Sequence, residues 1–361
     1  MDKELQAKLL PLRQKIDALD QQILDLINER ARTAQAVGDV KHGHPGESPV
    51  FRPEREVQVI RALAQANEGP IDAASIDAIW SQIISVCRGL EQEIRVAYLG
   101  PAGSFSEQAA FEFMGNAISG VSCPNFDEVF RVVEAGNADV GIVPVENSTE
   151  GAVNRTLDLL LNTPLKIVGE HSILIRHCLL TKSGTMDGVT RVMAHPQALA
   201  QCQHWLGLHQ PGLQREPAAS NAEAARIAAE DPTVAAIASD IAARAWGLNI
   251  VEEGIQDDPM NRTRFLAIGR MPTLPTGGDM TSLILAVPNE AGAVYQMLTP
   301  LAEHGVSMAR FESRPARTGQ WEYYFYVDIE GHQDDPQVAV ALELLRKRCA
   351  FFKILGSFPK Q

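Results

Sequence analysis

The 361-residue chain lacks the motifs that mark many cofactor-dependent and secreted proteins. Its five cysteines are scattered and form no Cys-x-x-Cys pair, so neither a metal site nor a disulfide framework is expected. No dinucleotide fingerprint or Walker loop occurs, so no nucleotide cofactor is expected. No apolar run is long enough to cross a membrane, and the charged N-terminus has no signal-peptide core. These absences predict a cytoplasmic protein without metal or cofactor.

Positive charge is also scarce. The formal net charge of -13 argues against nucleic acid or an anionic membrane as a partner. An anionic substrate would therefore be held by local arginines and not by the field of the whole protein. At this length a single ordinary core is not expected, so the chain should form two or three domains.

Residues 1–92 are expected to be all-helical. Apolar residues recur every three or four positions in a first helix that is predicted to run to Val40. The stretch from His42 to Pro49 then interrupts the pattern with two prolines and two glycines. Pro53 suits the first turn of a second helix, and Asp72 can cap a third.

Residues 93–274 alternate short apolar strands with helices. This alternation predicts an α/β module with mainly parallel sheets. Residues 272–279 are rich in proline and glycine and are predicted to be a linker. Residues 280–361 follow a βαββαβ order, which is typical of a ferredoxin-like fold. The strands expected in the α/β module include Val140 to Val145, Lys166 to Ile175, Arg191 to Ala194 and Val234 to Ala238.

Three cations on the first predicted helix suggest an anion site. Arg30 and Lys41 lie about 16 Å apart on nearly one face of the helix, so their side chains could reach a small dianion between them. Arg13 lies about 40 Å from Lys41 and could serve only a site built by a second, antiparallel copy. The alternative is three solvated charges on an exposed helix. Further polar positions favour a site: Arg55, Glu56 and Glu91.

This helical segment resembles the all-helical chorismate mutase family over residues 1–92. The resemblance implies that cations grip the substrate carboxylates and that Lys41 also approaches the ether oxygen during a rearrangement that needs no nucleophile. Arg52 stands where the family often has Asp, and Glu91 stands where a Gln amide usually donates; an ionised Glu cannot donate. The implied catalytic residues are Lys41 and Glu91, and the implied chorismate-binding set is Arg13 from the partner chain, Arg30, Lys41, Arg55, Glu56, Cys87 and Glu91.

Polar turns follow several strands of the middle module. In open α/β sheets, ligands bind beyond the carboxyl ends of the strands, where helix N-termini present free amides to anions. Helix capping alone would account for Ser104 and Ser220, and His195 before Pro196 fits a helix entry. Glu146, Asn147 and Ser148 exceed what one cap requires and favour function. The turns are Gly103 to Ser106, Glu146 to Thr149, His195 to Gln197, and Ser220 with Asn221.

The stretch from Asn261 to Phe265 places one hydroxyl between two arginines before a predicted strand from Arg264 to Arg270. Arginines bind carboxylates in bidentate pairs, and a hydroxyl beside bound carboxylates can donate to a departing group. The alternative is a solvated surface turn.

These segments together resemble prephenate dehydratase over residues 95–274, with Gly100 to Ser106 and Pro144 to Ser148 as further matches. The resemblance implies two α/β lobes like those of periplasmic binding proteins, and conversion of prephenate to phenylpyruvate with loss of carbon dioxide and water. Thr263 is the expected donor to the leaving hydroxyl. The implied prephenate-binding set is Ser104, Glu146, Asn147, Ser148, Asn221, Thr263 and Arg264.

The C-terminal module is similar to an ACT regulatory domain. Glu312 to Pro315 is the strongest match, and Gly292, Ala293 and Val294 stand for the usual Gly-Ala-Leu. Ordinary loop chemistry is the alternative for both motifs. The resemblance implies that phenylalanine binds at an interface between two copies and alters activity. The implied effector residues are Gly292, Ala293, Val294, Glu312, Ser313, Arg314 and Pro315.

The whole chain thus resembles the bifunctional chorismate mutase/prephenate dehydratase family. It is expected to be a multi-domain homodimer or higher oligomer that acts on chorismate and prephenate, with phenylalanine as effector. The rival hypothesis is a non-catalytic amino-acid sensor whose helical segment only dimerises. Arg13, Arg30, Lys41 and Thr263 argue against this rival, because a sensor needs neither a cation cage nor a positioned hydroxyl. A dehydrogenase partner for the mutase is disfavoured by the missing dinucleotide fingerprint.

Overall fold

The computed structural model describes the chain except residues 1–2, 43–50, 289, 317–322 and 361. It divides into two compact units. The first comprises residues 1–52, 59–94 and 114–118, and the second comprises residues 53–58, 95–113 and 119–361. Among the described helices, none is both long and apolar enough to pass through a lipid bilayer. The cytoplasmic location stays a prediction.

The N-terminal segment is helical, as expected. Helix α1 (Lys3–His42) continues two residues beyond the predicted end, and most of the expected break lies outside the described residues. Helix α2 (Pro53–Ala66) begins at its proline. Helix α3 (Ala73–Glu91) is capped by the Asp72 carboxylate, which accepts a hydrogen bond from the Ser75 amide at 2.7 Å.

Helix α1 exposes a long apolar stripe. Ile16, Ile23 and Leu26 keep 56%, 54% and 65% of their surface accessible, and they recur at helical spacing along much of the 40-residue helix. Isolated exposed leucines are ordinary, but a continuous apolar stripe marks a surface that another element covers. The further exposed apolar residues of α1 and α3 are Leu5, Leu10, Leu12, Leu19, Leu24, Val37, Val40, Ile79, Val86 and Leu90.

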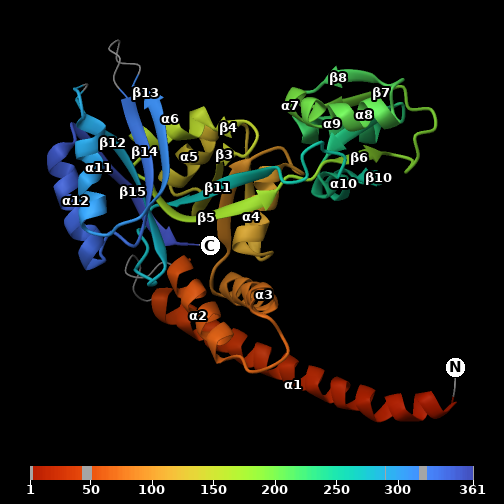
Figure 1. Cartoon of the computed structure of the whole chain (residues 1–361). Helices are drawn as coiled ribbons and strands as arrows, with labels where there is room; N and C mark the ends of the chain where they lie inside the picture. The colour runs from red at the N-terminus through yellow and green to blue at the C-terminus, as the bar shows by residue number, and fades with distance from the viewer. Residues whose placement is uncertain (1–2, 43–50, 289, 317–322, 361) are drawn as a thin grey trace. The chain divides into compact units, whose positions relative to one another are not determined.

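The second unit contains two α/β lobes and a C-terminal domain (Figure 1). The sheet of the first lobe has the order β2-β1-β3-β11-β5, with the short β4 paired to β3. Its helices fill the connections between the strands. The strands are β1 (Ile94–Leu99), β2 (Ile118–Cys123), β3 (Val140–Asn147), β4 (Gly151–Ala152), β5 (Lys166–Leu174) and β11 (Arg262–Gly269), and the helices are α4 (Phe105–Met114), α5 (Phe126–Glu134) and α6 (Asn154–Asn162).

The second lobe is inserted between β5 and β11. Its sheet has the order β10-β6-β9-β7-β8, and separate apolar clusters, one including Ala224 and Leu180 and the other including Leu206 and Val192, cover its two faces. The strands are β6 (Cys178–Thr181), β7 (Arg191–Ala194), β8 (Gln214–Pro217), β9 (Val234–Ala238) and β10 (Asn249–Glu253), and the helices are α7 (Pro196–Gln201), α8 (Gln203–His209), α9 (Asn221–Glu230) and α10 (Asp240–Trp246).

The prediction of mainly parallel sheets was wrong, because both sheets are mixed. Parallel pairs join β1 with β3 and β7 with both β8 and β9. Strand β11 is antiparallel to β3 and β5, and β6 is antiparallel to β9 and β10. Strand β5 ends where the chain leaves the first sheet for the second lobe, and β11 begins beside that end when the chain returns. Strand β11 must therefore run in the opposite direction to β5. Alternation of strands and helices does not report such a return.

The C-terminal domain has the predicted ferredoxin-like order. Its antiparallel sheet runs β13-β14-β12-β15, and helices α11 and α12 cover one face (Figure 1). The opposite face shares one apolar cluster with the first lobe, to which Ile284, Tyr326 and Phe358 contribute. The elements are β12 (Asp279–Ala286), α11 (Ala293–Glu303), β13 (Met308–Pro315), β14 (Tyr323–Glu330), α12 (Pro336–Arg348) and β15 (Phe351–Pro359).

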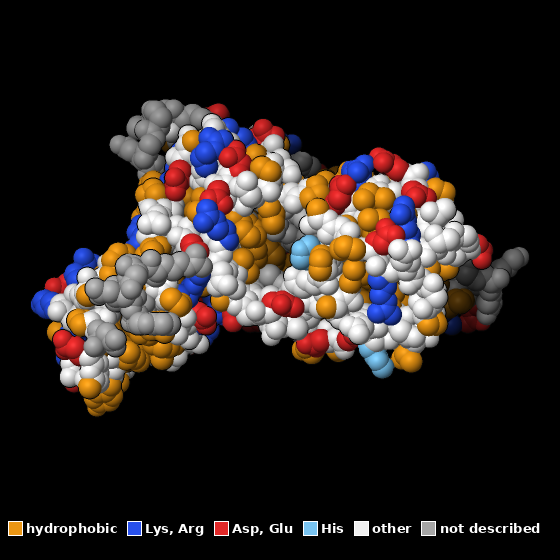
Figure 2. Space-filling view, turned by 90° about the horizontal axis from the view of Figure 1, so that it is seen from above, with side chains coloured by type: hydrophobic (Ala, Val, Ile, Leu, Met, Phe, Trp, Pro, Cys, Tyr) orange, Lys and Arg blue, Asp and Glu red, His pale blue; other side chains and the backbone are white. Residues whose placement is uncertain are grey.

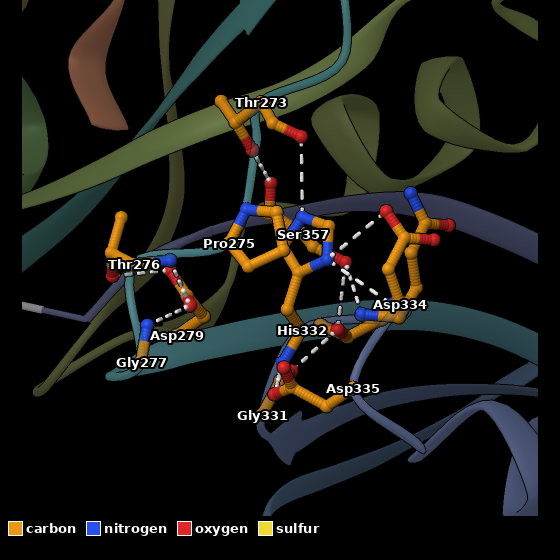
Figure 3. A network of polar contacts seen from close by, with 12 residues as sticks. Thr273, Pro275, Thr276, Gly277, Asp279, Gly331, His332, Asp334, Asp335 and Ser357 are labelled. Carbon is orange, nitrogen blue, oxygen red and sulfur yellow. Dashed lines mark hydrogen bonds and ion pairs between the residues drawn. The ribbon is translucent and has the colours of Figure 1, made fainter. Parts of the chain in front are cut away.

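The predicted linker is fixed to the C-terminal domain by polar contacts (Figure 3). The buried Thr273 hydroxyl donates to the Ser357 carbonyl, and a ring nitrogen of the buried His332 lies 3.2 Å from the Thr273 carbonyl oxygen. The Asp279 carboxylate accepts hydrogen bonds from the amides of Thr276 and Gly277, at 2.7 and 3.1 Å. The connection is therefore an ordered part of the domain.

Candidate functional site

A cleft of about 320 Å³ lies between the two lobes. Its walls come from the carboxyl ends of β1 and β3, the start of β11 and the N-terminus of α4 in the first lobe, and from α7 and α9 in the second. This volume suits a small metabolite. Four of the predicted prephenate-binding residues line the cleft: Ser104, Asn147, Asn221 and Thr263.

The Thr263 hydroxyl is held by Asn147. The Asn147 amide nitrogen lies 2.8 Å from Thr263 Oγ1 and 2.9 Å from Asn261 Oδ1. The Asn147 oxygen accepts hydrogen bonds from the backbone amides of Thr149 and Glu150, at 3.0 and 3.1 Å, which fixes the orientation of the amide. Because Asn147 donates to Thr263 Oγ1, the hydroxyl keeps its own proton for a ligand. Thr263 and Asn147 are each 8% exposed, so little water competes.

Helix N-termini supply positive potential to the cleft. Ser104 caps α4 by accepting from the Glu107 amide at 3.2 Å, and Ser220 caps α9 by accepting from the Glu223 amide at 3.0 Å. The Asn221 side-chain oxygen accepts from the His195 amide at 2.9 Å and ties α9 to α7. None of the described residues that line the cleft is Lys or Arg. An anion in the cleft would therefore be held by helix termini and neutral donors.

Charged side chains of both signs are mixed on the visible surface. In Figure 2, Lys and Arg side chains alternate with Asp and Glu side chains over the visible face. No cluster of positive charge stands out among the described residues on this face, so recognition of an anion depends on local groups.

Three predicted prephenate-binding residues do not line the cleft. Successive residues of a strand point to opposite faces, and Thr263 faces the cleft, so Arg264 faces the C-terminal domain. Glu146 pairs with Arg264 across the ladder and also points away, to Arg310. Ser148 instead fixes the turn before β11, because its hydroxyl accepts from the Arg262 amide at 2.9 Å.

Among the cleft residues that escaped the sequence analysis are His177 and Gln201. His177 is 2% exposed, and its Nε2 lies 2.9 Å from Gln201 Oε1. Burial lowers the pKa of His177, which favours the neutral ring. Gln197 and Gln201 are four residues apart on α7 and both line the cleft, so their spacing was the one usable signal. A lone histidine before an apolar strand gave none.

The first unit brings together two of the predicted mutase residues. Lys41 Nζ of α1 lies 3.2 Å from Glu91 Oε2 of α3, and Cys87 is buried one turn before Glu91. Arg30 lies half-buried on the same helix as Lys41. Arg13 is exposed and, on the continuous α1, about 42 Å from Lys41. Arg55 and Glu56 lie in the first turn of α2, just after Arg52.

The predicted effector residues fall at two places in the C-terminal domain. Gly292 has a φ of 81° and precedes α11, and no residue in the described part of the chain caps the first amides of this helix with its side chain. Glu312, Ser313 and Pro315 are exposed on β13, which lies at the end of the sheet. Arg314 is buried, and its guanidinium lies 3.1 Å from Asp158 of α6 and donates to the Asn154 carbonyl at 2.5 Å. The Arg314 side chain is therefore engaged in contacts within its own chain.

The fold and these sites define a multi-domain enzyme of small anionic metabolites. One cleft holds an oriented hydroxyl beside helix N-termini, a separate helical unit carries a cation and a carboxyl group in contact, and a ferredoxin-like domain adjoins the cleft-bearing lobe.

Family models match all three regions of the chain. A chorismate mutase type II model matches residues 12–92, a prephenate dehydratase model matches residues 96–273, and an ACT domain model matches residues 281–343. A bifunctional chorismate mutase/prephenate dehydratase of Neisseria gonorrhoeae is 47% identical, and the match covers 99% of both chains.

Solved structures resemble about three quarters of the chain. A prephenate dehydratase from Arthrobacter aurescens, crystallised with L-Phe, is 34% identical with a TM-score of 0.68, over 74% of this chain and 90% of that one. A protein described as a quorum quenching acylase, GqqA, has the same TM-score at 33% identity, over 74% of this chain and 98% of that one.

The chain belongs to the bifunctional chorismate mutase/prephenate dehydratase family. It carries both enzymes on one polypeptide, so it rearranges chorismate to prephenate and converts prephenate to phenylpyruvate on the way to phenylalanine. Its fold class is the predicted one: a helical mutase module, a two-lobed α/β dehydratase module and an ACT domain.

Proposed function

We propose that Thr263 donates a hydrogen bond to the departing hydroxyl of prephenate. The observation that carries the proposal is the 2.8 Å contact from the Asn147 amide nitrogen to Thr263 Oγ1, which leaves the hydroxyl proton directed elsewhere. Aromatisation of the ring drives loss of carbon dioxide and water, so the enzyme needs mainly to assist departure of the hydroxyl. An unperturbed threonine is a poor acid, and donation of a hydrogen bond suffices.

The carboxylates of prephenate bind at the N-termini of α4 and α9 in this proposal. Both helices begin at the cleft, and Ser104 and Asn221 shape their first turns. Free amides and the helix dipole favour an anion there. This arrangement explains how a cleft whose described lining has no Lys or Arg can take a dianionic substrate.

Replacement of Thr263 tests the proposed donor. Thr263→Ala should lower dehydratase turnover by about 100-fold or more, as the loss of one preorganised donor does elsewhere. Thr263→Ser keeps the hydroxyl and should retain most of the turnover. Mutase activity on chorismate, measured on the same preparations, should be unchanged in both variants. Dehydratase turnover of Thr263→Ala near the wild-type rate would exclude Thr263 as the donor.

The mutase site is proposed to combine residues of two copies. Lys41 and Glu91 are in contact within one chain, whereas Arg13 is too far along α1 to join them. The exposed apolar stripe of α1 gives a second copy a surface to cover. Arg13 of a partner would then complete a set with Arg30, Lys41, Arg55, Glu56, Cys87 and Glu91.

Complementation between two inactive variants tests this shared site. Arg13→Ala and Lys41→Ala homodimers should each lose mutase activity. After mixing and subunit exchange, random pairing leaves about a quarter of the sites intact, so about a quarter of the wild-type activity should return. No recovery in a mixture that forms heterodimers would place Arg13 outside the site.

Phenylalanine is proposed as the effector of the ACT domain. The Arthrobacter relative was crystallised with L-Phe, and the N-terminus of α11 after Gly292, which no described side chain caps, can receive a carboxylate. The effector residues would be Gly292, Ala293, Val294, Glu312, Ser313 and Pro315, with Arg314 anchoring their strand to α6.

We place the module boundaries at residues 1–92, 93–274 and 280–361, which the three family matches support.

A further inference from the structure

A nearly buried ion pair connects the ACT sheet to the strand that carries Thr263. Arg264 Nη1 lies 2.9 Å from Asp328 Oδ2 of β14, and Arg264 Nε donates to Glu170 Oε2 of β5 at 2.6 Å. The side chains of Arg264 and Asp328 are 14% and 10% exposed. Ser282 of β12 donates to Asp328 Oδ1 at 2.5 Å, so the carboxylate is held from its own sheet as well.

Arg264 and Thr263 are adjacent on β11 and point to opposite faces of the first sheet. The ladder between β11 and β3 is irregular between Arg264 and Phe265, where β3 carries an extra residue. Such bulges weaken the backbone pairing and re-aim the side chains beside them. The ladder to β5 is regular from Arg262 to Ala267, so Thr263 is held by its backbone on that side, and the Arg264 side chain adds an anchor on the face toward the ACT sheet.

The same network extends to the edge strand of the ACT domain. Arg310 of β13 pairs with Asp328 in the ladder, places Nε 3.8 Å from Asp328 Oδ2, and forms an ion pair with Glu146 of β3. Glu146 immediately precedes Asn147, which holds the Thr263 hydroxyl. Thr263 and Asn147, which both line the cleft, are thus each adjacent in sequence to a residue that forms an ion pair with the ACT sheet.

We propose that Asp328 of the ACT domain is a positioning residue for the dehydratase reaction: through Arg264 it sets the position of Thr263 in the cleft. The inference rests on the proposed donor role of Thr263. A shift of β14 relative to β11 would move the donor, although neither Asp328 nor Arg264 lines the cleft. Misplacement by about 1 Å can cost about 100-fold in turnover, so small motions suffice.

The test uses Asp328→Asn in the full-length protein. The amide keeps the size of the side chain and removes its charge, and Glu170 still pairs with Arg264, so that guanidinium is not left alone. We expect kcat for prephenate to fall about 10- to 100-fold with KM within about twofold. Mutase kinetics in the first unit should not change. Because Asp328 acts through Arg264, Arg264→Gln combined with Asp328→Asn should be no slower than Arg264→Gln alone.

A matched control comes from a different ion pair across the same interface, between Arg314 and Asp158. Asp158→Asn breaks the contact with Arg314, which is not on β11, and should leave the basal dehydratase kcat at the wild-type value. Ser282→Ala releases Asp328 more gently and should lower kcat by about threefold, also without a change in KM. This variant decides the question if Asp328→Asn does not fold, as judged by thermal melting.

The outcomes separate the inference from the proposed function. If Thr263→Ala is inactive while Asp328→Asn and Ser282→Ala turn over at the wild-type rate, the positioning role is refuted and the donor role stands. Equal losses in Asp328→Asn and Asp158→Asn would also refute it, because they would indicate general loosening of the interface. If the fold-losses in kcat of Arg264→Gln and Asp328→Asn multiplied in the double variant, Asp328 would not act through Arg264. An active Thr263→Ala would overturn both proposals.

Discussion

Asn147→Asp offers a sharp test of how the cleft works, because it removes the amide that donates to Thr263 Oγ1 and Asn261 Oδ1 and keeps the side-chain oxygen that accepts from the following turn. A carboxylate at this position still accepts from the amides of Thr149 and Glu150. It cannot donate to Thr263 Oγ1, and it instead draws the threonine proton toward itself. The hydroxyl that should face the substrate is then committed to the protein.

The expected loss follows from the number of donors removed. Withdrawing one preorganised donor from a developing charge costs roughly 2.7–4 kcal/mol, or about 100- to 1,000-fold in kcat. The new negative charge beside a dianionic substrate would also raise KM. Protonation of the introduced carboxyl restores a donor, so the deficit of Asn147→Asp should shrink as the pH falls. Asn147→Ala, which cannot titrate, should show no such recovery.

The assay is phenylpyruvate formation from prephenate across the pH range in which both variants stay folded, with mutase turnover as the internal reference. A loss in Asn147→Asp that does not depend on pH, or that matches Asn147→Ala throughout, would refute the idea that donation to Thr263 is what matters.

Two further predictions concern single residues. In the proposed mutase site a carboxylate at position 91 cannot donate to the chorismate ether oxygen and a Gln amide can, so Glu91→Gln should retain or raise mutase turnover in a chorismate assay; loss of turnover would contradict this role. Burial lowers the pKa of His177 below its ordinary 6.5, so the unfolded chain binds the extra proton first as pH drops. The stability of the second unit should therefore decline below about pH 6.5, by at most about 1.4 kcal/mol per pH unit from this group, and His177→Asn should remove that part of the slope in denaturant titrations.

Sequence patterns identified what is local. The three-module order, the cap at Asp72 and the hydroxyl of Thr263 could all be predicted, because periodicity and short motifs specify them directly. The direction of β11 could not, since it depends on where the chain returns from the inserted lobe. The facing of Arg264 and Glu146 away from the cleft follows from strand alternation once Thr263 is placed inward, but the carboxylates and guanidinium groups that receive them lie far away in the sequence.

The apolar cluster shared by the first lobe and the ACT sheet determines what a truncation of the protein would expose. A truncation after the dehydratase module would uncover the side of that cluster now sealed by Ile284, Tyr326 and Phe358, and would also remove the lysine of β15 whose ammonium caps the last carbonyls of α6. The truncated lobe would face water with a hydrophobic surface and would tend to aggregate. Point substitutions could therefore relieve feedback, whereas deletion of the ACT domain would also destabilise the dehydratase lobe. The regulatory domain is in this sense a structural part of the enzyme that it controls.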